Sequence, residues 1–171
     1  METDNLDIAA ALGNTENEGT EVWNMKLYDK LTSLEGRINR LRYIGLNILA
    51  LIISVVYATV AGLVIGSIWA IRGFPEFVVD LLAGLVLLPV VYITYAIIVK
   101  RLYDTGRGDG WITYAQALCI LLIIWSMAPV GSTIETSLDL ITSIMGLPLG
   151  IVCLFFRGDA SPNQFGPDPL G

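Results

Sequence analysis

Residues 43–71 read YIGLNILALIISVVYATVAGLVIGSIWAI, a run of 29 residues that contains no Asp, Glu, Lys or Arg. A helix of roughly 20 apolar residues crosses the ~30 Å hydrocarbon core of a bilayer, so this run predicts a transmembrane helix that is long enough to tilt. The rest of the chain agrees, because 54% of its 171 residues are hydrophobic and only 15% are charged. In soluble domains about a quarter of the residues are charged. We therefore expect an integral membrane protein.

Three further apolar runs follow, and the four predicted spans cover about 44–70, 77–99, 111–130 and 138–156. Ahead of the first span, apolar residues recur at steps of three and four, as on one face of an amphipathic helix: Trp23, Leu27, Leu31, Leu34, Ile38 and Leu41. Gly36 is expected to weaken or break that helix. The predicted fold class is all-α, an integral membrane bundle of four transmembrane helices with a preceding amphipathic interfacial helix.

Residues 1–22 carry six acidic residues and no basic residue, which accounts for the whole net charge of −6. Such a polar, like-charged segment has too little apolar surface to form a core, so we expect an acidic, disordered N-terminal tail. The membrane domain would then comprise residues 23–171.

The basic residues predict how the spans are oriented. Nine of the ten Lys and Arg residues precede the first span, lie between the second and third, or follow the fourth, and only Arg72 lies in the opposite loops. Lys and Arg in short loops favour the cytoplasmic side of a membrane. We therefore expect both termini and the central loop to be cytoplasmic.

Small residues recur along the first and fourth spans at intervals of four, among them Ala58, Gly62, Gly66, Gly146 and Gly150. Small side chains at this spacing let helix backbones approach closely. We expect them to pack helices together within the four-helix bundle; the alternative is contact with a second copy of the chain.

Three segments on the predicted cytoplasmic side stand out: Gly36-Arg37-Ile38-Asn39-Arg40, the twelve residues Lys100–Trp111, and Asn163-Gln164-Phe165-Gly166-Pro167-Asp168-Pro169. Together, in this order around four spans, they resemble the bacterial inner-membrane family of domain of unknown function 805 (DUF805), from about Trp23 to Pro169. The resemblance implies a multi-pass protein of the bacterial inner (plasma) membrane and implies no biochemical activity. The chain departs from the family pattern at Tyr103, where the family tends to have His, so a titrating imidazole cannot be essential here.

These segments predict a polar cluster at the cytoplasmic surface. Its candidate members are Gly36, Arg37, Arg40, Lys100, Arg101, Asp104, Arg107, Trp111, Phe165, Gly166 and Asp168. Arginine and carboxylate groups form bidentate pairs, and we expect Asp104 to pair with Arg40 or Arg101. Two interpretations stay open. The cluster is either the positive-inside signal reinforced by salt bridges, or a site whose bases recognise an anionic lipid headgroup or phosphate.

The predicted spans carry no ionisable residue near their centres, which argues against a proton- or ion-coupled transporter. The chain has no histidine, and Cys119 and Cys153 fall inside spans, where cysteine behaves as a small hydrophobe. We expect no catalytic residue, metal site, cofactor or nucleic-acid partner. The leading hypothesis is a non-enzymatic protein that binds anionic lipid, another membrane protein or a second copy. A small oligomeric transporter or channel is the alternative, and an enzyme acting on lipid through Asp104, Asp109 or Asp168 ranks third.

Overall fold

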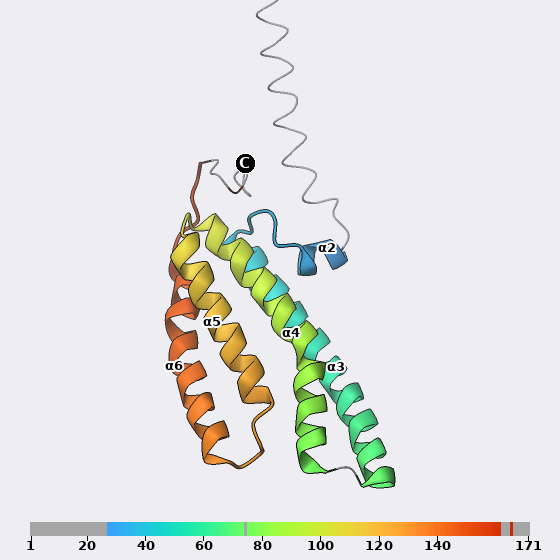
Figure 1. Cartoon of the computed structure of the whole chain (residues 1–171). Coiled ribbons are helices and arrows are strands. Elements are labelled where there is room, and N and C mark those ends of the chain that lie inside the picture. The colour runs from blue at the N-terminus through green and yellow to red at the C-terminus, as the bar shows by residue number, and fades with distance from the viewer. Residues whose placement is uncertain (1–26, 74, 162–164, 166–171) are drawn as a thin grey trace, which may run out of the picture.

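The computed structural model describes residues 27–73, 75–161 and 165, and within them the chain forms five helices and no strand (Figure 1). The helices are α2 Leu27–Thr32, α3 Arg40–Arg72, α4 Glu76–Asp104, α5 Asp109–Ser126 and α6 Thr133–Phe155. The last four are long and apolar enough to cross a membrane. The predicted bundle of four spans is therefore confirmed for the described part of the chain, and the predicted tail of residues 1–22 lies outside it.

The amphipathic helix ahead of the first span is only partly present among the described residues. α2 covers 6 residues, and Trp23, the first residue of the predicted apolar face, lies outside the description. Residues 33–39, the linker, follow without helical structure, and Gly36 has φ 87°, a left-handed conformation that other residues rarely adopt. The side chain of Asn39 accepts a hydrogen bond from the Arg42 N–H at 2.9 Å and so starts α3. The break expected at Gly36 is therefore present, within a linker that separates α2 from α3.

Two of the span boundaries that differ from the prediction have local causes. α6 begins five residues earlier than expected, because the Ser132 hydroxyl accepts the Glu135 N–H at 3.1 Å and caps the helix there. α5 ends at Ser126, earlier than expected, because Pro129 disfavours helical backbone in the residue before it.

α4 is the central helix, since it contacts α2, α3, α5 and α6. Figure 1 shows an α3–α4 hairpin and an α5–α6 hairpin that diverge away from the end at which α4 finishes. α4 bends along its length and contains Pro89, which removes one helical hydrogen bond. Buried apolar side chains gather near the end of α4, and they include Ile97, Leu102, Leu149 and Cys153. The tightest packing therefore lies at that end of the bundle.

The outer surface of α3 is apolar. Leu51, Val55 and Leu63 are each more than half exposed, with 63%, 58% and 68% of their surface accessible. Water would disfavour this much exposed apolar surface, whereas lipid chains accept it. The exposure therefore agrees with a helix that faces lipid.

The small residues of the first and fourth spans do not pack as expected. No described atom lies within 4 Å of a Cβ built on Gly62, Gly66, Gly146 or Gly150, and Ala58 is exposed. Close packing within one chain is therefore not found at these positions, because the hairpins diverge and α3 turns this stripe outward. Close packing of these glycines against a neighbouring helix is not observed in the described part of the chain.

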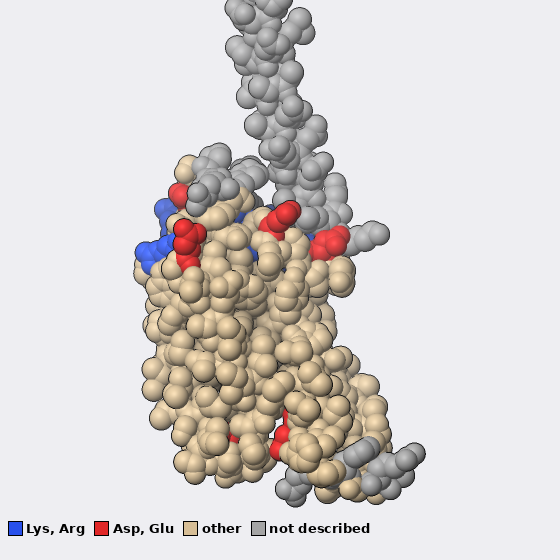
Figure 2. All heavy atoms as spheres, viewed as in Figure 1, with Lys and Arg blue, Asp and Glu red and all other residues tan. Residues whose placement is uncertain are grey.

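Basic residues gather at one end of the molecule. Figure 2 shows the blue side chains at the upper end, above a broad surface with few charges, whereas red side chains are visible at both ends. We call the upper end the basic end, and its described bases are Lys30, Arg37, Arg40, Arg42, Lys100, Arg101, Arg107 and Arg157. The distribution matches the separation of charges that the sequence predicts.

Candidate functional site

The end of α4 positions the central residues of the candidate site. Gly106 has φ 66° and follows the helix, and its N–H donates to the Tyr103 carbonyl at 3.2 Å. The Arg107 N–H reaches back to the Leu102 carbonyl, also at 3.2 Å. This pair of bonds is a Schellman motif, which ends a helix at a left-handed glycine. The chain therefore reverses immediately after Asp104, the last residue of α4.

Three buried charged residues meet at this point, and we call them the clamp: Arg37, Arg101 and Asp104. Arg101 and Asp104 lie one helical turn apart, so both project from the same face of α4. The Nη1 of Arg101 donates a hydrogen bond to the Oδ2 of Asp104 and forms an ion pair with it. The other carboxylate oxygen lies 3.4 Å from the Arg37 Nη2. The three residues are only 3%, 1% and 2% exposed. Arginines from the linker and from α4 thus engage both oxygens of one carboxylate.

Arg101 also holds the end of α6. Its Nε donates to the Cys153 carbonyl at 2.9 Å, and its Nη2 donates to the Phe156 carbonyl at 2.7 Å. Arg40 donates to the Phe155 carbonyl at 3.2 Å. The last carbonyl groups of a helix have no partner within the helix and carry a partial negative charge, which cations stabilise. Two arginines from outside α6 therefore cap its C-terminus.

Arg37 connects the clamp to residues 157–161, the C-terminal segment. Its Nη1 donates to the Ser161 carbonyl at 2.8 Å, and its Nη2 donates to the Asp159 carbonyl at 2.5 Å. The Asp159 N–H in turn donates to the Asp104 backbone carbonyl at 2.7 Å. The segment after the fourth span is thus bound at two of its residues.

Gly158 allows this close approach. A Cβ at this position would overlap the carboxylate of Asp104, so any larger residue would push the segment away. The linker approaches from the other side, where the Ile38 N–H lies 3.4 Å from the Lys100 carbonyl. The clamp consequently joins three parts of the chain that are far apart in sequence: the linker, the end of α4 and the C-terminal segment.

The charges of the clamp are balanced by backbone groups. It contains two guanidinium groups and one carboxylate, and the remaining positive charge faces the carbonyl oxygens of α6 and of the C-terminal segment. Removing ions from water costs several kcal/mol each unless they are paired and hydrogen-bonded. Every clamp residue has such partners. The arrangement is suited to holding a fixed shape, and it leaves the Asp104 carboxylate no open side toward solvent.

Aromatic residues close the site beside the clamp. The rings of Tyr103 and Phe165 stack with centroids 4.1 Å apart, and a Cβ on Gly108 would come within 2.8 Å of the Phe165 ring. The guanidinium of Arg107 lies 3.8 Å from the centre of the Phe156 ring, a cation–π contact. Tyr103 therefore serves as a stacking surface at the position where the family tends to have His.

The other predicted members of the cluster lie around this centre. Lys100 is 4% exposed, and its Nζ donates to the Lys30 carbonyl at 2.6 Å. Trp111 makes an edge-to-face contact with Tyr114, with ring centroids 5.8 Å apart. Two predicted members lie outside the described residues: Gly166 and Asp168.

Comparison with known families gives a match over most of the chain. A family model described as "Protein of unknown function (DUF805)" covers residues 31–167, which include the clamp and all four spans. The chain belongs to this family. No curated protein and no solved structure was found to match the chain. Membership of DUF805 confirms the resemblance seen in the three motifs and names no activity for them.

The clamp brings together residues from two of the three predicted motifs. The expected pairing of Asp104 with Arg101 is confirmed, whereas Arg40 does not pair with Asp104 and instead bonds α6. Arg37 takes the place that Arg40 was expected to share, because the linker is not helical and passes directly over the end of α4.

Sequence reasoning missed the C-terminal segment. Gly158 allows a close contact, and Asp159 and Ser161 contribute backbone carbonyls, so only Gly158 is recognisable from its residue type. A glycine directly after the last span, in a short charged stretch, is the signal. Backbone acceptors leave no trace in residue type, so the partners of Arg37 could not be inferred.

Proposed function

We propose that this chain is a non-enzymatic, multi-pass membrane protein that binds anionic lipid at its basic end. The observation that carries the proposal is the contrast between the clamp and the bases around it. The clamp residues are at most 3% exposed and engage one another and backbone carbonyls, whereas Arg40 and Arg157 lie exposed at the same end. A shape held by buried charges and surrounded by accessible bases suits recognition of negative charge.

A role in binding also explains why the central carboxylate is enclosed. A general acid or base must come within hydrogen-bond reach of its substrate. Asp104 is 2% exposed and both of its oxygens face arginines, so a substrate would reach it only after the clamp opened. Asp109 is exposed at the start of α5, so it lacks the buried position that Asp104 has in the clamp.

The proposed location is the bacterial inner membrane, with the basic end and both termini in the cytoplasm. Two arguments support it: the resemblance of the three motifs to an inner-membrane family, and the excess of Lys and Arg at one end. Anionic lipids on the cytoplasmic leaflet attract bases that lie near the membrane surface. Location and proposed ligand are therefore mutually consistent.

The experiment uses the full chain in vesicles that contain equal amounts of phosphatidylglycerol and phosphatidylcholine. After extraction in a mild detergent, mass spectrometry of the intact protein counts the retained lipids. We expect phosphatidylglycerol to be enriched, and the enrichment to fall as salt shortens the Debye length from about 10 Å to about 3 Å. Equal retention of the two lipids would refute the proposal. Solute or ion flux through the same protein in liposomes would favour the transporter instead.

A further inference from the structure

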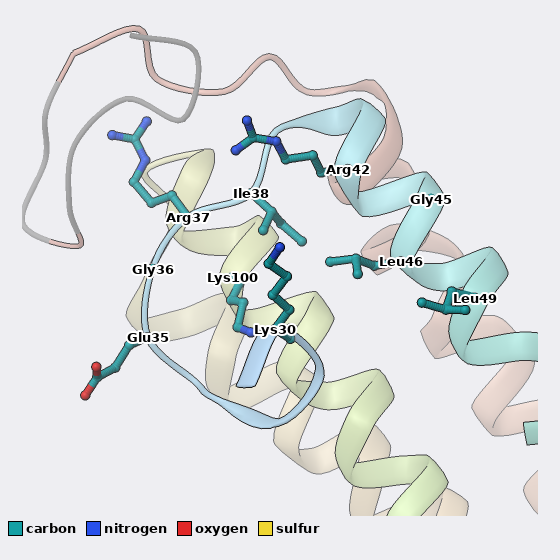
Figure 3. Close-up of a pocket in the computed structure, with 10 residues that line it drawn as sticks. All are labelled: Lys30, Glu35, Gly36, Arg37, Ile38, Arg42, Gly45, Leu46, Leu49 and Lys100. Carbon is teal, nitrogen blue, oxygen red and sulfur yellow. Dashed lines mark hydrogen bonds between the residues drawn. The ribbon is translucent and has the colours of Figure 1, made fainter. Parts of the chain in front are cut away.

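A pocket of about 320 Å³ lies beside the clamp, between the linker and α3 (Figure 3). We call it the linker pocket. It is lined by Lys30, Glu35, Gly36, Arg37, Ile38, Arg42, Gly45, Leu46, Leu49 and Lys100. Sites for small molecules occupy roughly 300–1,000 Å³, so the pocket can hold a headgroup and the first part of an acyl chain.

α3 gives the pocket a polar mouth and an apolar depth. Arg42, Gly45, Leu46 and Leu49 occupy positions i, i+3, i+4 and i+7, so they share one face of the helix. From Arg42 to Leu49 the helix rises by about 10 Å, at 1.5 Å per residue. Figure 3 shows the Leu46 and Leu49 side chains directed from α3 toward the pocket. No described atom lies within 4 Å of a Cβ built on Gly45, so the space beside this glycine is open.

The facing wall adds positive charge. Lys30, Arg37, Arg42 and Lys100 line the pocket with a single acidic residue, Glu35, whose carboxylate points away from it in Figure 3. The Lys30 side chain extends across the middle of the pocket in the same view. An anionic group is therefore the complementary partner at the mouth.

The wall is held in place by α4. The Lys100 Nζ donates to the Lys30 carbonyl at 2.6 Å, and the Tyr92 hydroxyl donates to the Thr32 carbonyl at 3.0 Å. These bonds fix both ends of the last turn of α2 against α4. The pocket is thus part of the folded end of the bundle.

We infer that the linker pocket binds one anionic phospholipid, with its phosphate near Lys30 and Arg42 and the start of an acyl chain along Leu46 and Leu49. A free phosphate would use the bases and leave the apolar wall exposed, whereas a lipid uses both. The inference rests on the proposed function, because it assigns the anionic lipid bound at the basic end to one specific site.

The experiment repeats the lipid-retention measurement with three pocket variants of the full chain. Lys30→Gln and Arg42→Gln each remove one charge, and we expect each to lower phosphatidylglycerol retention about fivefold. Gly45→Phe fills the pocket without changing any charge, and we expect the bound lipid to be lost. Arg72→Gln and Gly62→Phe are the matched controls: the first removes a base at the opposite end of α3, and the second places the same ring on an open glycine of the same helix. Both controls should retain the lipid.

Three further results would overturn the assignment. If the three pocket variants retain phosphatidylglycerol as well as the controls do, the linker pocket is not the site, although the proposed function stands as long as the unaltered chain still prefers this lipid. If the unaltered chain shows no preference, both fail. An excess of inorganic phosphate should displace no more lipid than sodium chloride of the same ionic strength does; displacement by phosphate beyond that level would show that the pocket is an anion site and not a lipid site.

Discussion

Replacing Asp104 by Asn should destabilise the protein far more than the same change at Asp109. Asp104 is 2% exposed, and its two oxygens face Arg37 and Arg101, themselves 3% and 1% exposed. The amide keeps the shape of the side chain and removes its charge, which leaves two buried guanidinium groups without a counter-charge. Breaking a buried ion pair by removing one partner typically costs about 3–5 kcal/mol. The carbonyl partners of both arginines remain, so we expect a cost of about 3 kcal/mol, at the lower end of that range.

The magnitude can be measured by reversible unfolding of the purified chain in mixed micelles of increasing denaturing-detergent content. Asp109 is exposed in the first turn of α5, where an acidic residue contributes about 0.3–1 kcal/mol through the helix dipole. Asp109→Asn therefore controls for loss of a negative charge in the same loop. If the two variants unfold within about 1 kcal/mol of each other, the clamp does not hold the basic end together and this reasoning fails.

The remaining predictions concern the contacts around the clamp and the orientation of the bundle. Gly158→Ala should release the C-terminal segment, because a Cβ there overlaps the Asp104 carboxylate. Limited proteolysis should therefore cut this variant faster than the unaltered chain. Gly110→Ala is the control, because no described atom lies near an added Cβ there, and it should be cut at the unaltered rate. Phe165→Ala removes the ring stacked on the end of α4 and should lower the free energy of unfolding by about 1 kcal/mol in the same detergent titration; no change would show that the stacking is incidental. In intact cells, a membrane-impermeant thiol reagent should label Val130→Cys and spare Gly110→Cys; the reverse pattern would place the basic end outside.

The spans could be predicted because they depend on composition alone. Whether a run of residues spans the membrane depends on the cost of burying charge in lipid. Neither the packing of the helices nor the angles between them change that cost. The pairing of Arg101 with Asp104 could also be predicted from the sequence, because residues one turn apart in a helix share a face.

The partner of Asp104 from the linker could not be predicted in the same way. Gly36 with φ 87° and the Asn39 cap replace a continuous helix by an extended linker, and the resulting path brings Arg37, and not Arg40, to the carboxylate. The outward position of Gly62 depends on how far the hairpins diverge. Neither feature is a property of a single segment, since each depends on how separate segments meet.

The central claim is that Arg37 and Asp104, which are 67 positions apart in sequence, act together in a buried clamp. A double-mutant cycle of Arg37→Gln and Asp104→Asn, measured by reversible unfolding, tests it most directly. Residues in contact show coupling free energies of about 0.5–3 kcal/mol, whereas independent sites are additive within about 0.3–0.5 kcal/mol. We predict a coupling of at least about 1 kcal/mol, with the double variant less destabilised than the sum of the two single variants. Additive effects would contradict the clamp.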